Sequence, residues 1–229
     1  MQLDSRLKAV AGFVKEGSRV ADIGTDHAYL AIYLIRSKRA RFVIASDKNN
    51  GPYESAKRTV KSEGISDKEI QVRIGDGLST IVPGEVDTIC IAGMGGVLIS
   101  EILESSPEVL AGVDILVLQP MNAAKELRIW LYEHHWYIAD ECLAVADGRI
   151  YEIIQAKRGE RTVPPDVLLS IGPVLWEKKP DMLKHHIERL LFQAKRVATG
   201  MEKSRQAQES DRYSDIQREI HELEEHLKW

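Results

Sequence analysis

Short apolar runs alternate with stretches whose apolar residues recur every three or four positions over residues 1–156. The runs are typical of strands buried on both faces, and the other stretches have the spacing of one helix face. Strands that alternate with helices build a parallel sheet covered on both sides, so the pattern predicts a doubly wound α/β fold. The predicted strands are 20–23, 42–45, 70–74, 86–92 and 113–118, and the predicted helices are 3–14, 28–35, 52–62, 97 onward and 123–134.

Two further stretches, 137–146 and 149–156, follow the last of these helices and are joined by Asp147-Gly148. That dipeptide is typical of a tight turn between antiparallel strands. We therefore expect a mostly parallel, seven-stranded, Rossmann-like sheet whose last strand is antiparallel.

The chain changes character after this hairpin. Residues 157–166 are polar and include a double proline, which indicates a domain boundary. Beyond it apolar residues recur in steps of three and four over 183–201, lapse, and resume over 213–227. Two such heptad stretches predict an antiparallel coiled-coil hairpin. We expect one domain at 1–160 and a helical domain at 161–229.

The first strand ends in a turn that carries the main chemical signal, Asp22-Ile-Gly-Thr-Asp-His27. A strand, a glycine turn and a helix is the geometry that nucleotide-type cofactors use, and Gly24 allows close approach of a ligand. Further glycines of a dinucleotide fingerprint are missing, and Asp22 and Asp26 would repel a pyrophosphate. They would attract the amine and sulfonium of S-adenosylmethionine (SAM). We therefore favour SAM over NAD, the alternative being a strand–helix junction without a ligand.

Acids and glycines also follow the second, third and fourth predicted strands, at positions that suit other parts of the same cofactor. Asp47 follows the second strand 23 residues after Gly24, the spacing at which a carboxylate binds the two ribose hydroxyls. Asp76-Gly77 follows the third strand and suits an adenine amine, although acid–glycine pairs are also common in turns. Gly93-Met-Gly-Gly96 follows the fourth, and we expect its bare backbone to face the ligand crevice; a glycine hinge is the alternative.

Composition restricts the class of protein. An apolar content of 44% and a charged content of 29% are typical of a soluble globular protein, and no apolar run is long enough for a membrane span. The N-terminus lacks a signal-peptide core, so a cytoplasmic protein is expected. Cys90 and Cys142 fit no metal-binding spacing; we expect two buried thiols and no metal.

The net charge of −4 hides an uneven distribution. Residues 178–205 contain eight Lys and Arg against three acids, whereas 209–229 contain seven acids against three bases. A further basic cluster occupies 36–41. Local patches decide attraction to a polyanion, so both basic stretches are candidate nucleic-acid contacts, or else solvated helix faces.

The motifs together resemble a known family. Asp22-Ile-Gly-Thr-Asp-His-Ala-Tyr29, Ala92-Gly-Met-Gly-Gly96, Gln119-Pro120 and Arg128-Ile-Trp130, followed by a coiled-coil tail, are similar to the bacterial tRNA (adenine-22-N1)-methyltransferases of the TrmK family. The resemblance implies the fold of a SAM-dependent methyltransferase and a tRNA substrate. It also implies the cofactor-binding set, which is Asp22, Gly24 and Asp26 for the methionine part, Asp47 for the ribose, Asp76 and Gly77 for the adenine, and Ala92, Gly93 and Met94 at the methyl-transfer site. Thr25 and Lys48, next to these residues, belong to the same predicted set.

The predicted chemistry needs no strong base, because adenine N1 carries a lone pair at neutral pH. The enzyme must orient N1 against the methyl group of SAM, and the nucleotide must be turned out of its stack. Nearby acids would stabilise the cationic product, and an aromatic ring would stack on the base. The residues predicted to contact the target base and support methyl transfer are Asp26, His27, Tyr29, Gln119 and Asn122. His27 bonded to the backbone and Tyr29 in the core are the alternatives.

Three other functions remain open from the sequence. One is methylation of another RNA base or of a small molecule, although a metabolite needs no long helical extension. The second is a non-catalytic SAM-binding adaptor whose helices pair with a partner protein, and the third is a nicotinamide oxidoreductase. A monomer or weak homodimer is expected.

Overall fold

The computed structural model describes residues 3–229, and the chain divides into two compact units, Met1–Thr162 and Val163–Trp229. The first unit contains a seven-stranded sheet in the order β3-β2-β1-β4-β5-β7-β6. Its strands are β1 (Ser18–Ile23), β2 (Ala40–Asp47), β3 (Ile70–Ile74), β4 (Thr88–Met94), β5 (Ile115–Pro120), β6 (Trp136–Ala146) and β7 (Arg149–Arg158).

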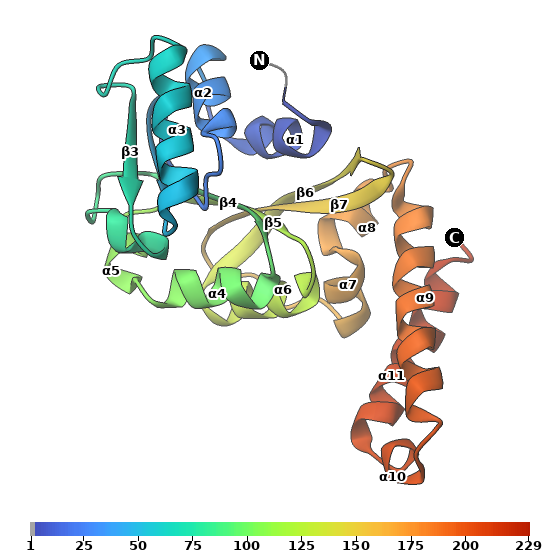
Figure 1. Ribbon diagram of the computed structural model, residues 1–229. Coiled ribbons are helices and arrows are strands. Elements are labelled where there is room, and N and C mark those ends of the chain that lie inside the picture. Colours follow the sequence, from blue (N-terminus) through green and yellow to red (C-terminus); the bar gives the residue numbers. More distant parts are fainter. Residues whose placement is uncertain (1–2) are drawn as a thin grey trace. The chain divides into compact units, whose positions relative to one another are not determined.

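Helices cover both faces of this sheet (Figure 1). The first five strands run parallel, and β7 is antiparallel to both β5 and β6. The predicted doubly wound sheet with a reversed strand near its end is therefore confirmed. One face carries α1 (Ser5–Phe13), α2 (Tyr29–Arg36) and α3 (Asn50–Ser62), and the other carries α4 (Gly96–Glu104), α5 (Pro107–Leu110) and α6 (Ala124–Glu133).

The core lies on the two faces of the central strands. Every residue of β5 is buried, as are the apolar residues of β1 and the first four residues of β4. Strands covered by helices on both sides need apolar residues at successive positions, which is why these runs do not alternate. Among the buried polar residues of these strands are Asp22 in β1 and Gln119 in β5.

The second unit consists of helices. These are α7 (Asp166–Ile171), α8 (Pro173–Lys178), α9 (Leu183–Met201), α10 (Arg205–Gln208) and α11 (Asp211–His226). The helices α9 and α11 pack side by side, as the heptad pattern predicts (Figure 1). Where that pattern lapses, the one-turn helix α10 lies between two serine N-caps, Ser204 and Ser210.

Some predicted details are wrong. The sequence pattern missed α5, α7, α8, α10 and the 3₁₀ turn η1 (Gly77–Thr80), because elements of four to six residues show too little of a helical period to be recognised. The expected pair of buried thiols is half right, since Cys90 is buried and Cys142 is only partly buried. Among residues 3–229, no helix is long and apolar enough to cross a membrane, and no group of His, Cys, Asp or Glu is arranged to hold a metal ion.

Candidate functional site

The loops at the carboxyl ends of β1, β2, β3 and β4 enclose one pocket of about 110 Å³. In an open α/β sheet this edge is where ligands bind, and the strand order reverses between β1 and β4. The pocket thus brings together the glycine turn, the ribose acid and the acid–glycine pair expected from the sequence. Its lining residues are Ile23, Gly24, Ser46, Asp47, Lys48, Asn49, Gly75, Asp76, Gly77, Met94, Leu98 and Ile102.

Gly24 is at a position whose backbone conformation disfavours any other residue. Its φ of +78° is one that L side chains rarely adopt, and a Cβ there would lie 2.1 Å from the Cε of Met94. The N–H groups of Gly24 and Thr25 donate to the Ser46 carbonyl at 2.8 and 3.0 Å. These bonds hold the turn after β1 against the end of β2.

Asp47 is fixed at the tip of β2. One of its carboxylate oxygens accepts from the Asn49 N–H at 2.7 Å, and its carbonyl accepts from the Gly75 N–H at 3.1 Å. The carboxylate thus keeps acceptor capacity at the pocket wall, which a ribose diol requires. On the neighbouring loop the Asp76 side chain is exposed, and its carbonyl accepts from both the backbone and the hydroxyl of Ser79.

Asp22 lies beneath the turn and does not line the pocket. Burial raises the pKa of this carboxyl to about 6, against a smaller lowering by the hydrogen bond with Thr25. The paired residue on β4 is Cys90, whose pKa burial raises well above its ordinary value, with a further contribution from Asp22. A buried carboxyl whose charge is this costly favours a cationic group nearby.

Asp26, His27 and Tyr29 form an exposed cluster at the start of α2. The Nε2 of His27 lies 3.3 Å from the Oδ2 of Asp26, and its Nδ1 shares a 2.6 Å hydrogen bond with the hydroxyl of Ser55 on α3. The rings of His27 and Tyr29 stack with centroids 5.1 Å apart. Tyr29 is 41% exposed, so it is not a core residue, and His27 bonds side chains instead of the backbone.

The glycine run Gly93–Gly96, from the end of β4 to the start of α4, has two structural roles. Gly93 has a φ of +81° and forms the irregularity in the pairing of β4 with β5. Gly96 has a different role from the one expected. It is buried, and a Cβ there would lie 2.1 Å from the Ala123 carbonyl oxygen, so Gly96 permits close packing of α4 on the next loop and does not face the crevice.

Gln119 and Asn122 lie in different surroundings. Gln119 is fully buried and hydrogen-bonded within the protein, whereas Asn122 is exposed on the loop after β5. The Asn122 carbonyl accepts from the Gly96 N–H at 2.9 Å, so the loop after β5 is bonded to the start of α4.

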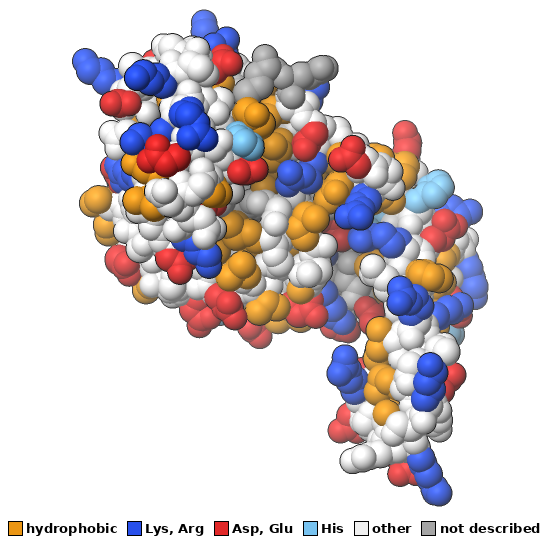
Figure 2. Space-filling view, viewed as in Figure 1, with side chains coloured by type: hydrophobic (Ala, Val, Ile, Leu, Met, Phe, Trp, Pro, Cys, Tyr) orange, Lys and Arg blue, Asp and Glu red, His pale blue; other side chains and the backbone are white. Residues whose placement is uncertain are grey.

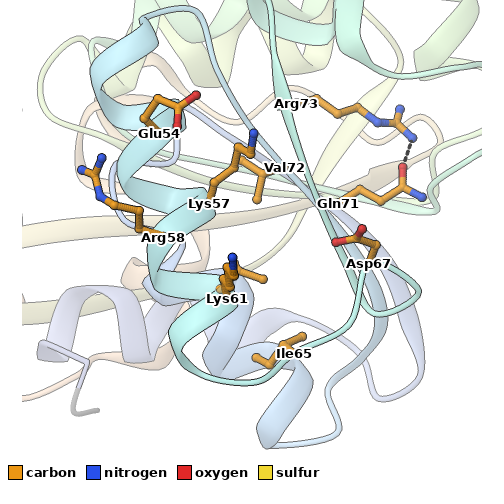
Figure 3. Close-up of a pocket in the computed structure, with 10 residues that line it drawn as sticks. Glu54, Lys57, Arg58, Lys61, Ile65, Asp67, Gln71, Val72 and Arg73 are labelled. Carbon is orange, nitrogen blue, oxygen red and sulfur yellow. Dashed lines mark hydrogen bonds between the residues drawn. The ribbon is translucent and has the colours of Figure 1, made fainter.

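A second, larger groove of about 710 Å³ runs between α3 and β3. Figure 3 shows Lys57, Arg58 and Lys61 of α3 along one side of it, and Arg73 of β3 bonded to Gln71. Glu54 and Asp67 also line it, and its interior is partly apolar. This groove lacks the glycine turn and the strand-end acids Asp47 and Asp76, so the smaller pocket is the candidate cofactor site in spite of the difference in volume.

The basic cluster at 36–41 lies away from the pocket. It follows the end of α2 and includes the first residues of β2, so it is at the amino-terminal edge of the sheet, opposite the pocket. Two of its members are engaged within the protein, Arg36 with Glu63 and Arg39 with the carbonyls of Gly12 and Val14.

This strand order, with acids at three adjacent strand ends around a glycine turn, defines the class of SAM-dependent methyltransferases. A family model, tRNA (adenine(22)-N(1))-methyltransferase (TrmK), matches residues 20–225. The chain belongs to that family, which confirms the resemblance seen in the sequence.

Individual relatives agree with this assignment. The chain is 41% identical over 184 residues to the tRNA (adenine(22)-N(1))-methyltransferase of Bacillus subtilis, covering 78% of this chain and 77% of that one. The crystal structure of the B. subtilis m1A22 tRNA methyltransferase TrmK has a TM-score of 0.88 at 32% identity and covers 99% of both chains. A Streptococcus pneumoniae protein solved in complex with SAM has a TM-score of 0.86 at 32% identity, covering 99% of this chain and 100% of that one.

Proposed function

We propose that this enzyme transfers the methyl group of SAM to N1 of adenine 22 in tRNA. The observation that carries the proposal is the convergence of Gly24, Asp47, Asp76 and Met94 on one pocket at the point where the strand order reverses. The names of the relatives supply the base and its position, and the S. pneumoniae complex supplies the methyl donor.

The cofactor roles follow from the placement of each group. Asp47 accepts from the ribose hydroxyls, while Asp76 and Gly77 line the place of the adenine ring. Asp22 and Asp26 provide the negative charge that favours the amine and sulfonium of the methionine part. SAM, when bound, supplies an electrophilic methyl group, and the protein's task is to hold it near the end of β4.

The target adenine belongs beside Asp26, His27 and Tyr29. The exposed Tyr29 ring is available for stacking on a base turned out of the tRNA, and the Asp26 carboxylate stabilises the positive charge that develops on the methylated ring. Ser55 and Asp26 hold the two ring nitrogens of His27, so its ring has a fixed orientation at this edge. Alignment supplies most of the catalysis, because N1 needs no deprotonation.

A tRNA-binding surface is provided by one face of α9. Lys184, Glu188, Phe192 and Arg196 are exposed and spaced by four residues, so they share a face with two cations, one acid and one aromatic ring. Phe192 is 62% exposed, and the Arg196 guanidinium lies 5.9 Å from its ring centroid. Cationic and hydrophobic side chains both lie along this hairpin (Figure 2). Cations hold phosphates and an exposed aromatic stacks on unpaired bases, so RNA is the partner that suits this face.

Calorimetric titration tests the cofactor assignment directly. We predict that SAM binds the wild-type chain while NAD⁺ does not, and that Asp47→Ala weakens SAM binding by about tenfold or more, because the diol loses a charged acceptor.

The matched control for this titration is Asp67→Ala, which removes a carboxylate from the α3–β3 groove and leaves SAM affinity within about twofold. Unchanged SAM affinity in Asp47→Ala, or tight NAD⁺ binding by the wild type, would contradict the assignment.

A further inference from the structure

A buried polar residue in β5 links the N-terminal helix α1 to the carboxyl end of β4. Gln119 has no exposed surface, yet both ends of its side-chain amide are bonded. Its Oε1 accepts from the Arg6 guanidinium at 2.7 Å and from the Gly93 N–H at 3.1 Å, and its Nε2 donates to the Pro120 carbonyl at 2.9 Å. An amide in an otherwise apolar strand is costly to bury, and these bonds offset that cost.

These bonds leave Gln119 without a free group for a substrate. The amide oxygen is shared by two donors, and the amide nitrogen is held by Pro120 and lies 3.7 Å from the Met121 sulfur. Gln119 therefore acts on the site only through the backbone that it holds.

The hydrogen bond to the Gly93 N–H fixes the plane of one peptide near the end of β4. The N–H of Gly93 and the carbonyl of Ala92 belong to one planar peptide, and none of the described peptides is cis. Holding the N–H therefore sets the direction of the carbonyl. Gly93 precedes Met94, whose side chain reaches Gly24 and lines the cofactor pocket. Gly93 itself has a positive φ and no side chain of its own to hold it in place.

Arg6 completes the link from outside the sheet. It belongs to α1, its side chain is 21% exposed, and its guanidinium lies 3.8 Å from Asp4 and 5.7 Å from the Tyr151 ring centroid. A Cβ on Gly93 would lie 3.5 Å from its Nη1, so the guanidinium covers the loop as well as holding Gln119. A bond from a charged donor polarises and holds the amide more strongly than a neutral one.

We propose that Arg6 is a positioning residue for methyl transfer, which holds the Ala92–Gly93 peptide and Met94 in place through Gln119. This inference rests on the proposed function. Misplacement of reacting groups by about 1 Å lowers rates by roughly a hundredfold, so a loosened loop should affect the chemical step more than binding.

Loss of Arg6 could also act by loosening α1 as a whole, and a variant elsewhere in the chain controls for that effect. The helix is capped by Asp4 through the Leu7 N–H, buries Val10 and Ala11, and is held at its other end by Gln155, whose Nε2 donates to the Phe13 carbonyl at 2.7 Å. Gln155→Ala thus removes an anchor of α1 without touching the Arg6–Gln119–Gly93 chain of hydrogen bonds.

The experiment measures single-turnover methylation of tRNA by the full chain, together with separate dissociation constants for SAM and tRNA. Arg6→Ala is expected to lower the methyl-transfer rate constant by about tenfold or more, with both dissociation constants within about twofold. Arg6→Lys, which keeps a charged donor, recovers most of the rate, and Gln155→Ala keeps the wild-type rate.

A second variant keeps the proposal testable if Arg6→Ala folds poorly. Gln119→Met fills a similar volume without an acceptor and should lower the rate constant as Arg6→Ala does. The double variant should lose little more than either single one, because both act through one chain of hydrogen bonds.

Several results would overturn the proposal. A wild-type rate in Arg6→Ala, a raised tRNA dissociation constant with an unchanged rate, or an equal loss in Gln155→Ala would each do so. Absence of methylation by the wild type would instead remove the proposed function, before any variant is compared.

Discussion

At the residue scale, Asp22 is a buried acid next to the proposed cofactor pocket, and its ionised form is destabilised by burial. Burial raises the pKa of its carboxyl from 3.8 to about 6, so the folded chain without ligand holds this proton more tightly than the unfolded chain does. The contribution of Asp22 to stability is therefore present below pH 4 and is lost as the pH rises from about 4 to about 6. A cationic cofactor reverses this preference by favouring the ionised carboxylate.

We accordingly predict that SAM affinity depends on pH. Because the cofactor favours ionised Asp22, the dissociation constant should rise as the pH falls below about 6, by up to tenfold per unit. Calorimetry from pH 5 to 8 measures this, and Asp22→Asn should bind SAM more weakly at pH 7.5 with a flatter pH dependence. A wild-type dissociation constant that does not change over this range would contradict the role given to Asp22.

Some residues of the candidate site are predicted from local sequence patterns, and others are found only from contacts in the folded structure. Gly24, Asp47 and Asp76 stand at strand ends, where glycines and acids are conspicuous in the sequence, and the structure brings them to one pocket. Arg6 and Ser55 were missed. Arg6 lies 113 positions from Gln119, and Ser55 lies 28 positions from His27. The periodicity of apolar residues reports only on neighbours in the sequence, so it cannot predict contacts between residues so far apart.

At the scale of elements, periodicity was sufficient for long helices and buried strands. It missed the short helices α5, α7, α8 and α10, and it could not separate the two uses of the glycine run after β4. The need for glycine at Gly96 comes from the Ala123 carbonyl, which belongs to the loop after the next strand. Such steric constraints are visible only once the chain is folded.

A buried ionic group ties α6 to the terminal hairpin. The Arg128 guanidinium, which has no exposed surface, donates to Glu141 of β6 and to Glu152 of β7, each at 2.8 Å. Burial alone would lower the pKa of Arg128, but the two carboxylates raise it above its ordinary value. Arg128 belongs to the Arg-Ile-Trp motif, whose role in this structure is therefore to hold the edge of the sheet.

Arg128→Met should destabilise the fold by about 3–5 kcal/mol, because it leaves two carboxylates buried without their shared cation. Chemical denaturation measures this free energy of unfolding. The matched control is Arg36→Met, which breaks the solvent-exposed pair with Glu63 and should cost less than about 1 kcal/mol. Equal losses in the two variants would show that burial does not set the strength of these pairs.

At the scale of the whole molecule, the negative net charge does not describe the proposed RNA-binding surface. The net charge is −4, yet α9 carries an exposed face with Lys184, Phe192 and Arg196, and α11 is rich in acids. Some cations of α9 form ion pairs with acids of α11, as Lys195 does with Glu224 at 2.6 Å. Under the proposed function, RNA phosphates contact the exposed face of α9, and the charge of this face matters more than the total charge.

Charge reversal on this face should weaken tRNA binding. The double variant Lys184→Glu with Arg196→Glu is predicted to lower tRNA affinity by about tenfold or more and to reduce the salt dependence by about two phosphate contacts. SAM affinity should not change. Binding is measured by filter retention at several salt concentrations.

The control for this experiment alters the other helix by the same amount of charge. Arg212→Glu with Arg218→Glu on α11 should leave tRNA affinity within about threefold. If both double variants weaken binding equally, the effect belongs to total charge, and α9 has no special role.

The most direct test of the whole account is the identity of the methylated nucleoside. Purified full-length chain would be incubated with isotopically labelled SAM and a tRNA transcript, and the digested nucleosides analysed by mass spectrometry. We predict labelled N1-methyladenosine from the adenine-22 transcript and none from a transcript with guanine at that position. Label in any other nucleoside, or equal label in both transcripts, would contradict it.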